Sequence, residues 1–181
     1  HYSSARDVAI MSRELIKHEK IFDYTTIWMD SLRGGKFELA NTNKLIKYYN
    51  GANGLKTGST SKAGCCLSAT AERDGMELVA VVLGAEDTQT RFASASSLLN
   101  YGFSNYSLKK MTEKDEPMGE VRVSKGKAES VAAQASEAYS ILVKKSEKNE
   151  PEKTVKMKDS ITAPVKQGDK LGEIVYSENG E

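Results

Sequence analysis

The sequence predicts an α+β fold in which helices flank an antiparallel sheet and a small all-β domain follows. Three strand-like runs succeed one another between residues 54 and 84, and an amphipathic segment, 88–101, comes directly after them. Beyond Phe103 the chain carries only short strand-like runs and no second long helical pattern. We therefore expect two domains, residues 1–105 and residues 106–181.

The composition is that of a globular protein. Hydrophobic residues make up 39% and charged residues 28% of 181 residues, and the net charge of +1 argues against a nucleic-acid partner. No apolar run approaches the roughly 18 residues that span a bilayer. The chain opens on His1 and runs almost at once into a helical pattern, which is expected of a chain that begins inside a domain.

The two cysteines, Cys65 and Cys66, are neighbours in the sequence. On a strand they would point to opposite faces, and a disulfide between them would be strained. Redox or metal chemistry would need another spacing and further ligands. We expect two small buried residues, and neither a metal nor a cofactor.

The first helix is predicted from its start signal. Ser4 and Asp7 form a capping-box pair, and Val8, Met11 and Leu15 follow at helical spacing. We expect this helix to end near residues 18–20, with His18 as a solvated residue of its last turn.

The next thirty residues are mixed. Thr25–Met29 is rich in strand formers, and Trp28 within it is expected to be a half-buried sheet residue rather than a recognition aromatic. Leu32–Leu39 indicates a hairpin-like turn and a short strand. Asn41–Ile46 is polar and then apolar, typical of a short helix or a loop over the core.

Three strands in meander order follow, at residues 54–59, 64–71 and 76–84. Asp74-Gly75 between two apolar runs is a strong hairpin signal. Because the third run is apolar almost throughout, we expect that strand to be central and covered on both faces.

A helix is then predicted over Thr88–Tyr101, capped by Asp87 and stopped by Gly102. In the tail, strands are expected at 119–123, 140–143, 154–157 and 172–176. The nearly balanced lysines and glutamates there indicate a solvated surface rather than a dedicated charge patch.

The run Gly54–Thr60 contains the residues best suited to chemistry. Lys56 offers a positive charge to a substrate carboxylate, Thr57 a hydroxyl, and Gly58 room for an extended peptide to approach. An edge strand pairs with such a peptide through its backbone. The N–H of Ser59 could stabilise an oxyanion of acyl transfer. We expect this strand to form one wall of an active site.

The motifs resemble those of one family. They are His1–Asp7 with Met11 and Leu15-Ile16, Asn41–Leu45, Gly54–Thr60 with Ala63-Gly64, Val81–Ala85, Arg91-Phe92, Leu99–Phe103, and in the tail Ala163–Val165, Gly168-Asp169 and Gly172. This pattern, over essentially the whole chain, resembles the serine-type D-alanyl-D-alanine carboxypeptidases, the low-molecular-mass penicillin-binding proteins. Serine β-lactamases share the Lys-Thr-Gly element, but the β-rich tail favours the carboxypeptidases.

The resemblance implies part of a β-lactamase/transpeptidase-like domain and a mechanism. A nucleophilic serine attacks the D-Ala-D-Ala bond of a peptidoglycan stem peptide, an acyl-enzyme forms, and water hydrolyses it; β-lactam antibiotics acylate the same serine. Lys56 and Thr57 would engage the substrate carboxylate, and the Ser59 N–H would be an oxyanion donor. Arg91 would add charge near that pocket, unless it is a surface or helix-cap residue. The substrate implies an extracytoplasmic location at the cell envelope.

The sequence departs from the family at two motifs. Ser-x-x-Lys occurs at Ser59–Lys62, Ser107–Lys110 and Ser124–Lys127, and Ser-x-Asn at Ser177–Asn179, none where the family places it. The amphipathic helix by which the family contacts the membrane peripherally is not found after the β domain. We therefore expect a C-terminal portion that needs the N-terminal half of the catalytic domain as its partner and is inactive alone. The alternative is an inactive fragment that acts as a binding or positioning module.

Overall fold

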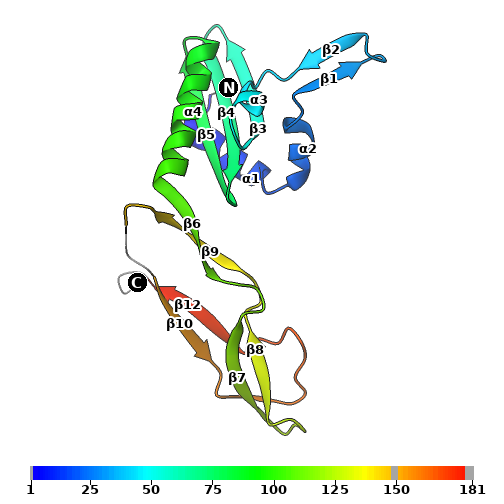
Figure 1. Cartoon of the computed structure of the whole chain (residues 1–181), viewed down its shortest axis with the longest axis vertical. Coiled ribbons are helices and arrows are strands. Elements are labelled where there is room, and N and C mark those ends of the chain that lie inside the picture. The colour runs from blue at the N-terminus through cyan, green and yellow to red at the C-terminus, as the bar shows by residue number, and fades with distance from the viewer. Residues whose placement is uncertain (1, 148–150, 178–181) are drawn as a thin grey trace. The chain divides into compact units, whose positions relative to one another are not determined.

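The structure is a computed structural model that describes residues 2–147 and 151–177, and it contains two compact units (Figure 1). The N-terminal unit is His1–Tyr106 and the C-terminal unit is Ser107–Glu181. The sequence places the boundary after residue 105. No helix in the described part of the chain is long and apolar enough to cross a membrane.

The N-terminal unit holds a three-stranded antiparallel sheet and its helices. In chain order its elements are α1 (Ala5–Leu15), the 3-10 helix η1 (Glu19–Ile21), α2 (Phe22–Thr25), β1 (Met29–Leu32), β2 (Phe37–Ala40), α3 (Leu45–Tyr48), β3 (Ala52–Thr60), β4 (Gly64–Arg73), β5 (Met76–Ala85) and α4 (Thr88–Asn105). The strand order is β3-β4-β5. The middle strand is therefore β4, and the expectation that the third strand of the meander would be central is wrong for the described sheet.

Helices α4 and α1 cover opposite faces of this sheet (Figure 1). Side chains alternate along β4, so that Leu67, Ala69 and Ala71 enter one apolar core with the α4 residues Ala95, Leu99 and Phe103. Between them, Ser68 points to the other face, where its hydroxyl lies 2.7 Å from that of Ser12 on α1. The apolar sequence of β5 follows from this arrangement, because both helices contact it.

Local signals place the start of α1, the turn between β4 and β5, and the start of α4. Ser4 and Asp7 form the predicted capping box, although the helix ends at Leu15, before the predicted residues 18–20. The hairpin signal is confirmed, since Asp74 and Gly75 both adopt positive φ, 51° and 74°. Asp87 caps α4 by accepting from the Thr90 N–H at 2.7 Å.

Gly102 does not stop α4, which continues to Asn105. A Cβ at Gly102 would overlap the side chain of Leu78 on β5. The glycine therefore lets the helix approach the sheet closely, and its place in the sequence reflects packing rather than a helix end.

The β1–β2 hairpin leaves the sheet as a separate two-stranded ribbon (Figure 1). It confirms the turn predicted within Leu32–Leu39. The run Thr25–Met29, although rich in strand formers, does not form a strand: Thr25 is the last residue of helix α2, and only Met29 lies in β1. Trp28 just before β1 is half-buried, and Lys47 Nζ lies 5.3 Å from its ring centroid.

The C-terminal unit is built of strands. They are β6 (Tyr106–Thr112, which starts at the last residue of the N-terminal unit), β7 (Pro117–Ser124), β8 (Ser130–Gln134), β9 (Tyr139–Lys144), β10 (Glu152–Met157), β11 (Ser160–Thr162) and β12 (Gly172–Ser177). The pairings are β6-β9, β10-β12 and β11-β7-β8, with β11 parallel to β7. Four strands were predicted within one or two residues; β6, β8 and β11 were not.

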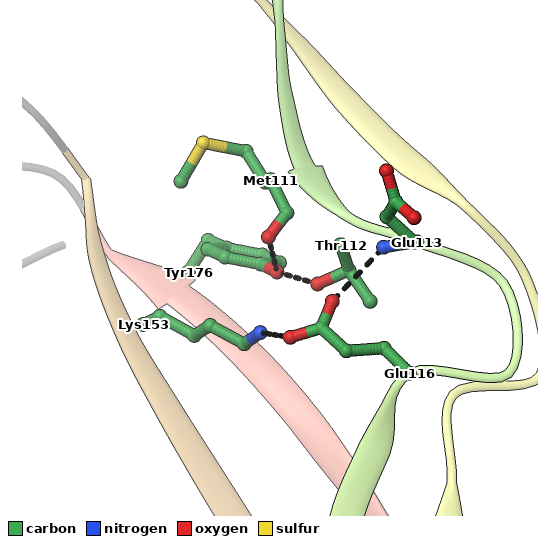
Figure 2. A network of polar contacts seen from close by, with 6 residues as sticks. All are labelled: Met111, Thr112, Glu113, Glu116, Lys153 and Tyr176. Carbon is green, nitrogen blue, oxygen red and sulfur yellow. Dashed lines mark hydrogen bonds and ion pairs between the residues drawn. The ribbon is translucent and has the colours of Figure 1, made fainter.

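A polar network joins the end of β6 to β10 and β12 (Figure 2). The Tyr176 hydroxyl donates to the Met111 carbonyl at 3.2 Å and also bonds the Thr112 hydroxyl. Lys153 Nζ lies 2.8 Å from a carboxylate oxygen of Glu116, whose other oxygen accepts from the Glu113 N–H. This network ties the first and last described strands of the unit together.

Candidate functional site

Strand β3 carries the predicted site residues along an edge of the sheet. Its register against β4 pairs Lys56 with Ser68, Thr57 with Leu67 and Gly58 with Cys66. Among the described strands only β4 is hydrogen-bonded to β3. The carbonyls of Asn53 and Gly54 at the start of β3 accept from the side chains of Thr25 and Asn43, so the open part of this edge lies around Gly58. The structure thus bears out the predicted edge strand.

Lys56 and Thr57 leave β3 on opposite faces, as successive strand residues do. Lys56 is exposed, and its ammonium donates to the Thr57 carbonyl. Thr57 is only 8% exposed, and its hydroxyl oxygen lies 2.7 Å from that of Thr42. One carboxylate can therefore meet both side chains only at the edge of the strand.

Gly58 and Ser59 complete this edge. No heavy atom would lie within 4 Å of a Cβ placed on Gly58, so the space over it is open. A side chain at this position would project into that open space without contacting the described protein atoms. Ser59 is exposed beside it and pairs with Cys65.

Arg91 lies against this strand from the side of α4. It is 6% exposed, and its guanidinium Nη1 donates to the carbonyls of Cys66 at 3.3 Å and Gly58 at 3.5 Å. Its Nε is buried with no hydrogen-bond partner among the described residues. Arg91 is therefore neither a surface nor a cap residue; it brings a buried positive charge behind the Lys-Thr-Gly strand.

The sequence interpretation missed the support given by Asn41, Thr42 and Asn43. Asn43 is 1% exposed and donates from Nδ2 to the Gly54 carbonyl of β3 at 2.9 Å, while its Oδ1 accepts from the Leu45 N–H. The signal was present, because asparagine side chains around a short polar run favour bonds to nearby backbone. The partner in β3 lies eleven residues away and is not visible in the pattern.

A second polar cluster fixes the start of β3. Asn53 accepts from the Thr70 hydroxyl at 2.6 Å and donates to Glu77 at 3.0 Å. Partial burial raises the pKa of the Glu77 carboxyl, and the bond from Asn53 opposes that shift. Because this cluster lies at the opposite end of the strand from Gly58, it positions the strand rather than contributing to its outer edge.

The Ser-x-x-Lys strings do not form a nucleophile site in the described residues. Ser59–Lys62 spans the end of β3 and the turn after it, where Thr60 accepts from the Ala63 N–H. Ser107–Lys110 lies in β6, and Ser124–Lys127 follows from the end of β7. In Ser177–Asn179 the last two residues lie outside the described residues. None of these serines opens a helix.

The two cysteines are half-buried and free rather than fully buried. Cys66 donates to the Ala63 carbonyl at 3.3 Å. No group of three or more potential metal-binding side chains occurs in residues 2–147 and 151–177.

Comparison with known proteins gives consistent matches over both units. Residues 1–87 match the D-alanyl-D-alanine carboxypeptidase family, and residues 106–181 match the C-terminal domain of penicillin-binding protein 5. The chain is 43% identical to the D-alanyl-D-alanine carboxypeptidase DacF of Bacillus subtilis over 100% of its own length and 48% of that protein. It is 32% identical to DacA of Haemophilus influenzae over 99% of its length and 46% of that protein.

Solved structures with the same fold cover the chain almost completely. A peptidoglycan synthesis regulatory factor (PBP3) from Streptococcus pneumoniae has a TM-score of 0.78 at 28% identity, over 98% of this chain and 51% of that one. Penicillin-binding protein 5 from Haemophilus influenzae has a TM-score of 0.72 at 29% identity, over 100% and 53%. The chain thus spans about half the length of the relatives it matches.

Proposed function

Residues 1–87 of this chain belong to the D-alanyl-D-alanine carboxypeptidase family and residues 106–181 to the penicillin-binding protein 5 C-terminal domain, and from this premise we propose its function. The chain supplies the substrate-binding wall of a serine-type carboxypeptidase. The full-length enzyme removes the terminal D-alanine from peptidoglycan stem peptides on the outer side of the cytoplasmic membrane.

The observation that carries this proposal is the edge strand β3 with Lys56, Thr57 and Gly58. A stem peptide would lie along the outer side of β3, over the open space at Gly58. Its terminal carboxylate would meet the exposed ammonium of Lys56 and, at the strand edge, the Thr57 hydroxyl. Arg91 would not touch the ligand. Its guanidinium binds the carbonyls of Gly58 and Cys66, and from there its positive charge would add to the attraction for the carboxylate.

The chemical step needs a serine that attacks the carbonyl of the penultimate D-alanine. The Ser59 N–H would stabilise the oxyanion, D-alanine would leave with a proton, and water would then hydrolyse the ester. We place this serine outside the 181 residues, because Ser59 is on the binding strand itself and the other two Ser-x-x-Lys strings belong to the C-terminal unit. β-Lactams would acylate the same serine.

The test uses the full-length natural protein and a peptide that ends in Lys-D-Ala-D-Ala. We expect release of D-alanine, and labelling by a fluorescent penicillin at a serine that maps outside this sequence. The isolated 181-residue chain should not be labelled. Absence of D-alanine release from the full-length protein would overturn the activity, whereas labelling of a serine within the chain would overturn the placement of the nucleophile.

A further inference from the structure

The hydroxyl of Thr57 is held by a second threonine hydroxyl. Thr57 Oγ1 and Thr42 Oγ1 lie 2.7 Å apart, a normal O–H···O distance in which either oxygen could donate. The Thr57 side chain is 8% exposed, whereas Thr42 is exposed. Thr57 belongs to the proposed carboxylate site, whereas Thr42 lies fifteen residues earlier in the chain.

The segment around Thr42 is fixed by the two asparagines that flank it. Asn41 Nδ2 donates to the carbonyls of Ile27 at 2.9 Å and Thr25 at 3.2 Å, and its Oδ1 accepts from the Asn43 N–H. Asn43 is bonded to the Gly54 carbonyl of β3. With both neighbours bound to backbone, Thr42 is held in place relative to β3, so its hydroxyl is a preset partner rather than a chance surface contact.

The direction of this hydrogen bond decides what Thr57 can offer to a ligand. A hydroxyl has one hydrogen to donate and two lone pairs to accept with, and an ionised carboxylate can only accept. If Thr57 donated to Thr42, the Thr57 hydroxyl would present only lone pairs to a carboxylate and could not bind it by a hydrogen bond. If Thr42 donates to Thr57, the Thr57 hydrogen is left for the carboxylate.

We propose that Thr42 is a positioning residue that donates its hydroxyl hydrogen to Thr57 and so sets Thr57 to recognise a carboxylate. The inference rests on the proposed function, which it deepens. It assigns to Thr42 a selectivity for ligands that end in a free carboxylate over those in which that group is an ester. Thr42 does not touch the ligand; it acts through Thr57.

The experiment measures acylation of the full-length protein by benzylpenicillin and by its methyl ester, which lacks the carboxylate. In Thr42→Val, which keeps the shape and removes the hydroxyl, we expect the acylation rate constant for benzylpenicillin to fall about three- to tenfold, the effect of one hydrogen bond. The rate for the methyl ester should not change. Thr42→Ser should restore the benzylpenicillin rate.

Two further variants separate positioning from general damage. In a Thr57→Val background, Thr42→Val should have no additional effect, because the two residues act as one unit. The matched control is Thr26→Val, an exposed threonine whose hydroxyl bonds the Phe22 carbonyl; it should leave both rates unchanged. Thermal unfolding checks each variant, and Thr42→Ala replaces Thr42→Val if the latter does not fold.

The outcomes are distinct. Equal loss for benzylpenicillin and its ester, additivity with Thr57→Val, or unfolding of both Thr42 variants would make Thr42 structural and overturn the inference. A wild-type protein that benzylpenicillin does not acylate would instead overturn the proposed function. Wild-type acylation with an unaffected Thr42→Val would reject the inference alone.

Discussion

The two compact units bury polar side chains in different ways. In the N-terminal unit the buried polar residues lie on or against β3 and β4; they are Ser12, Asn43, Thr57, Ser68, Thr70 and Arg91. In the described part of the C-terminal unit the buried polar residue is Thr112, which bonds Tyr176. Because burying a polar group costs free energy unless it is paired, the N-terminal unit concentrates that cost around two adjacent strands.

The apolar cores differ in the same sense. The N-terminal core joins β4 and β5 to the buried side of α4 through residues such as Leu67 and Leu99. The buried apolar residues described in the C-terminal unit are Val121, Ala133 and Ala135. The first unit therefore surrounds its buried polar residues with a larger apolar core, whereas the second is a lightly packed scaffold.

The largest expected effect tests this contrast in core packing. Leu99→Ala should destabilise the N-terminal unit by about 2–5 kcal/mol, because it leaves a cavity at a fully buried site. Denaturant unfolding followed by Trp28 fluorescence measures it, since the chain has one tryptophan and it lies in that unit. Val121→Ala in the C-terminal unit should leave the Trp28 transition in place. An equal shift from both variants would mean that the units unfold together.

The next effect concerns the exposed side of β3. Lys56→Ala should lower the rate of D-alanine release by the full-length protein by about a hundredfold or more, because it removes the ammonium that we propose meets the substrate carboxylate. Its unfolding midpoint should not move, since Lys56 is exposed. Lys36→Ala, an exposed lysine near the tip of the β1–β2 hairpin, is the control and should keep full activity. A comparable loss in Lys36→Ala would mean that general surface charge, not β3, governs the rate.

A smaller effect isolates the buried polar support of β3. Asn43→Ala should cost about 1–3 kcal/mol, because the Gly54 carbonyl loses its buried donor. The matched change Asn105→Ala removes an exposed bond to the Tyr101 carbonyl and should alter stability by less than about 0.5 kcal/mol. Chemical denaturation compares the two, and equal losses would contradict a special role for Asn43.

The smallest effect belongs to the C-terminal unit and depends on pH. The bonds from Lys153 and the Glu113 N–H lower the pKa of Glu116 below its ordinary value of 4.5. A carboxyl with a lowered folded-state pKa stabilises the fold above its unfolded pKa and loses that contribution as the pH falls through its folded pKa. The unfolding midpoint, followed by near-UV circular dichroism of the tyrosines, should therefore drop slightly below about pH 4.5.

Glu116→Gln provides the comparison for this titration. It should flatten that part of the acid dependence and leave the Trp28 transition untouched. A wild-type acid slope that persists in full in Glu116→Gln would assign the titration to another carboxyl.

Local chemistry made much of the fold predictable. The capping box at Ser4, the Asp74-Gly75 turn and the Asp87 cap are each decided by residues within three positions of one another. The meander order of the three strands was predicted and is confirmed. The central place of β4 and the length of α4 were not predictable, because their causes are remote in the chain. Gly102, for example, is explained by Leu78 on another element.

The candidate site likewise has a part that could be predicted from neighbouring residues and a part that could not. Lys56, Thr57, Gly58 and Ser59 are consecutive, so their pattern could be read directly and the edge strand inferred. The burial of Arg91 beneath the strand, and the contact of Thr42 with Thr57, join segments that are 33 and 15 residues apart. Such contacts depend on how the elements pack, which periodicity alone does not encode.

The β1–β2 hairpin has a closed base. The Asn41 N–H donates to the Trp28 carbonyl at 2.8 Å, and the Asn41 side chain binds the carbonyls of Thr25 and Ile27. The chain thus enters and leaves the ribbon at one fastened point, just before Thr42. A change in the turn between β1 and β2 would therefore leave these bonds, and with them the place of Thr42 beside β3, unaltered.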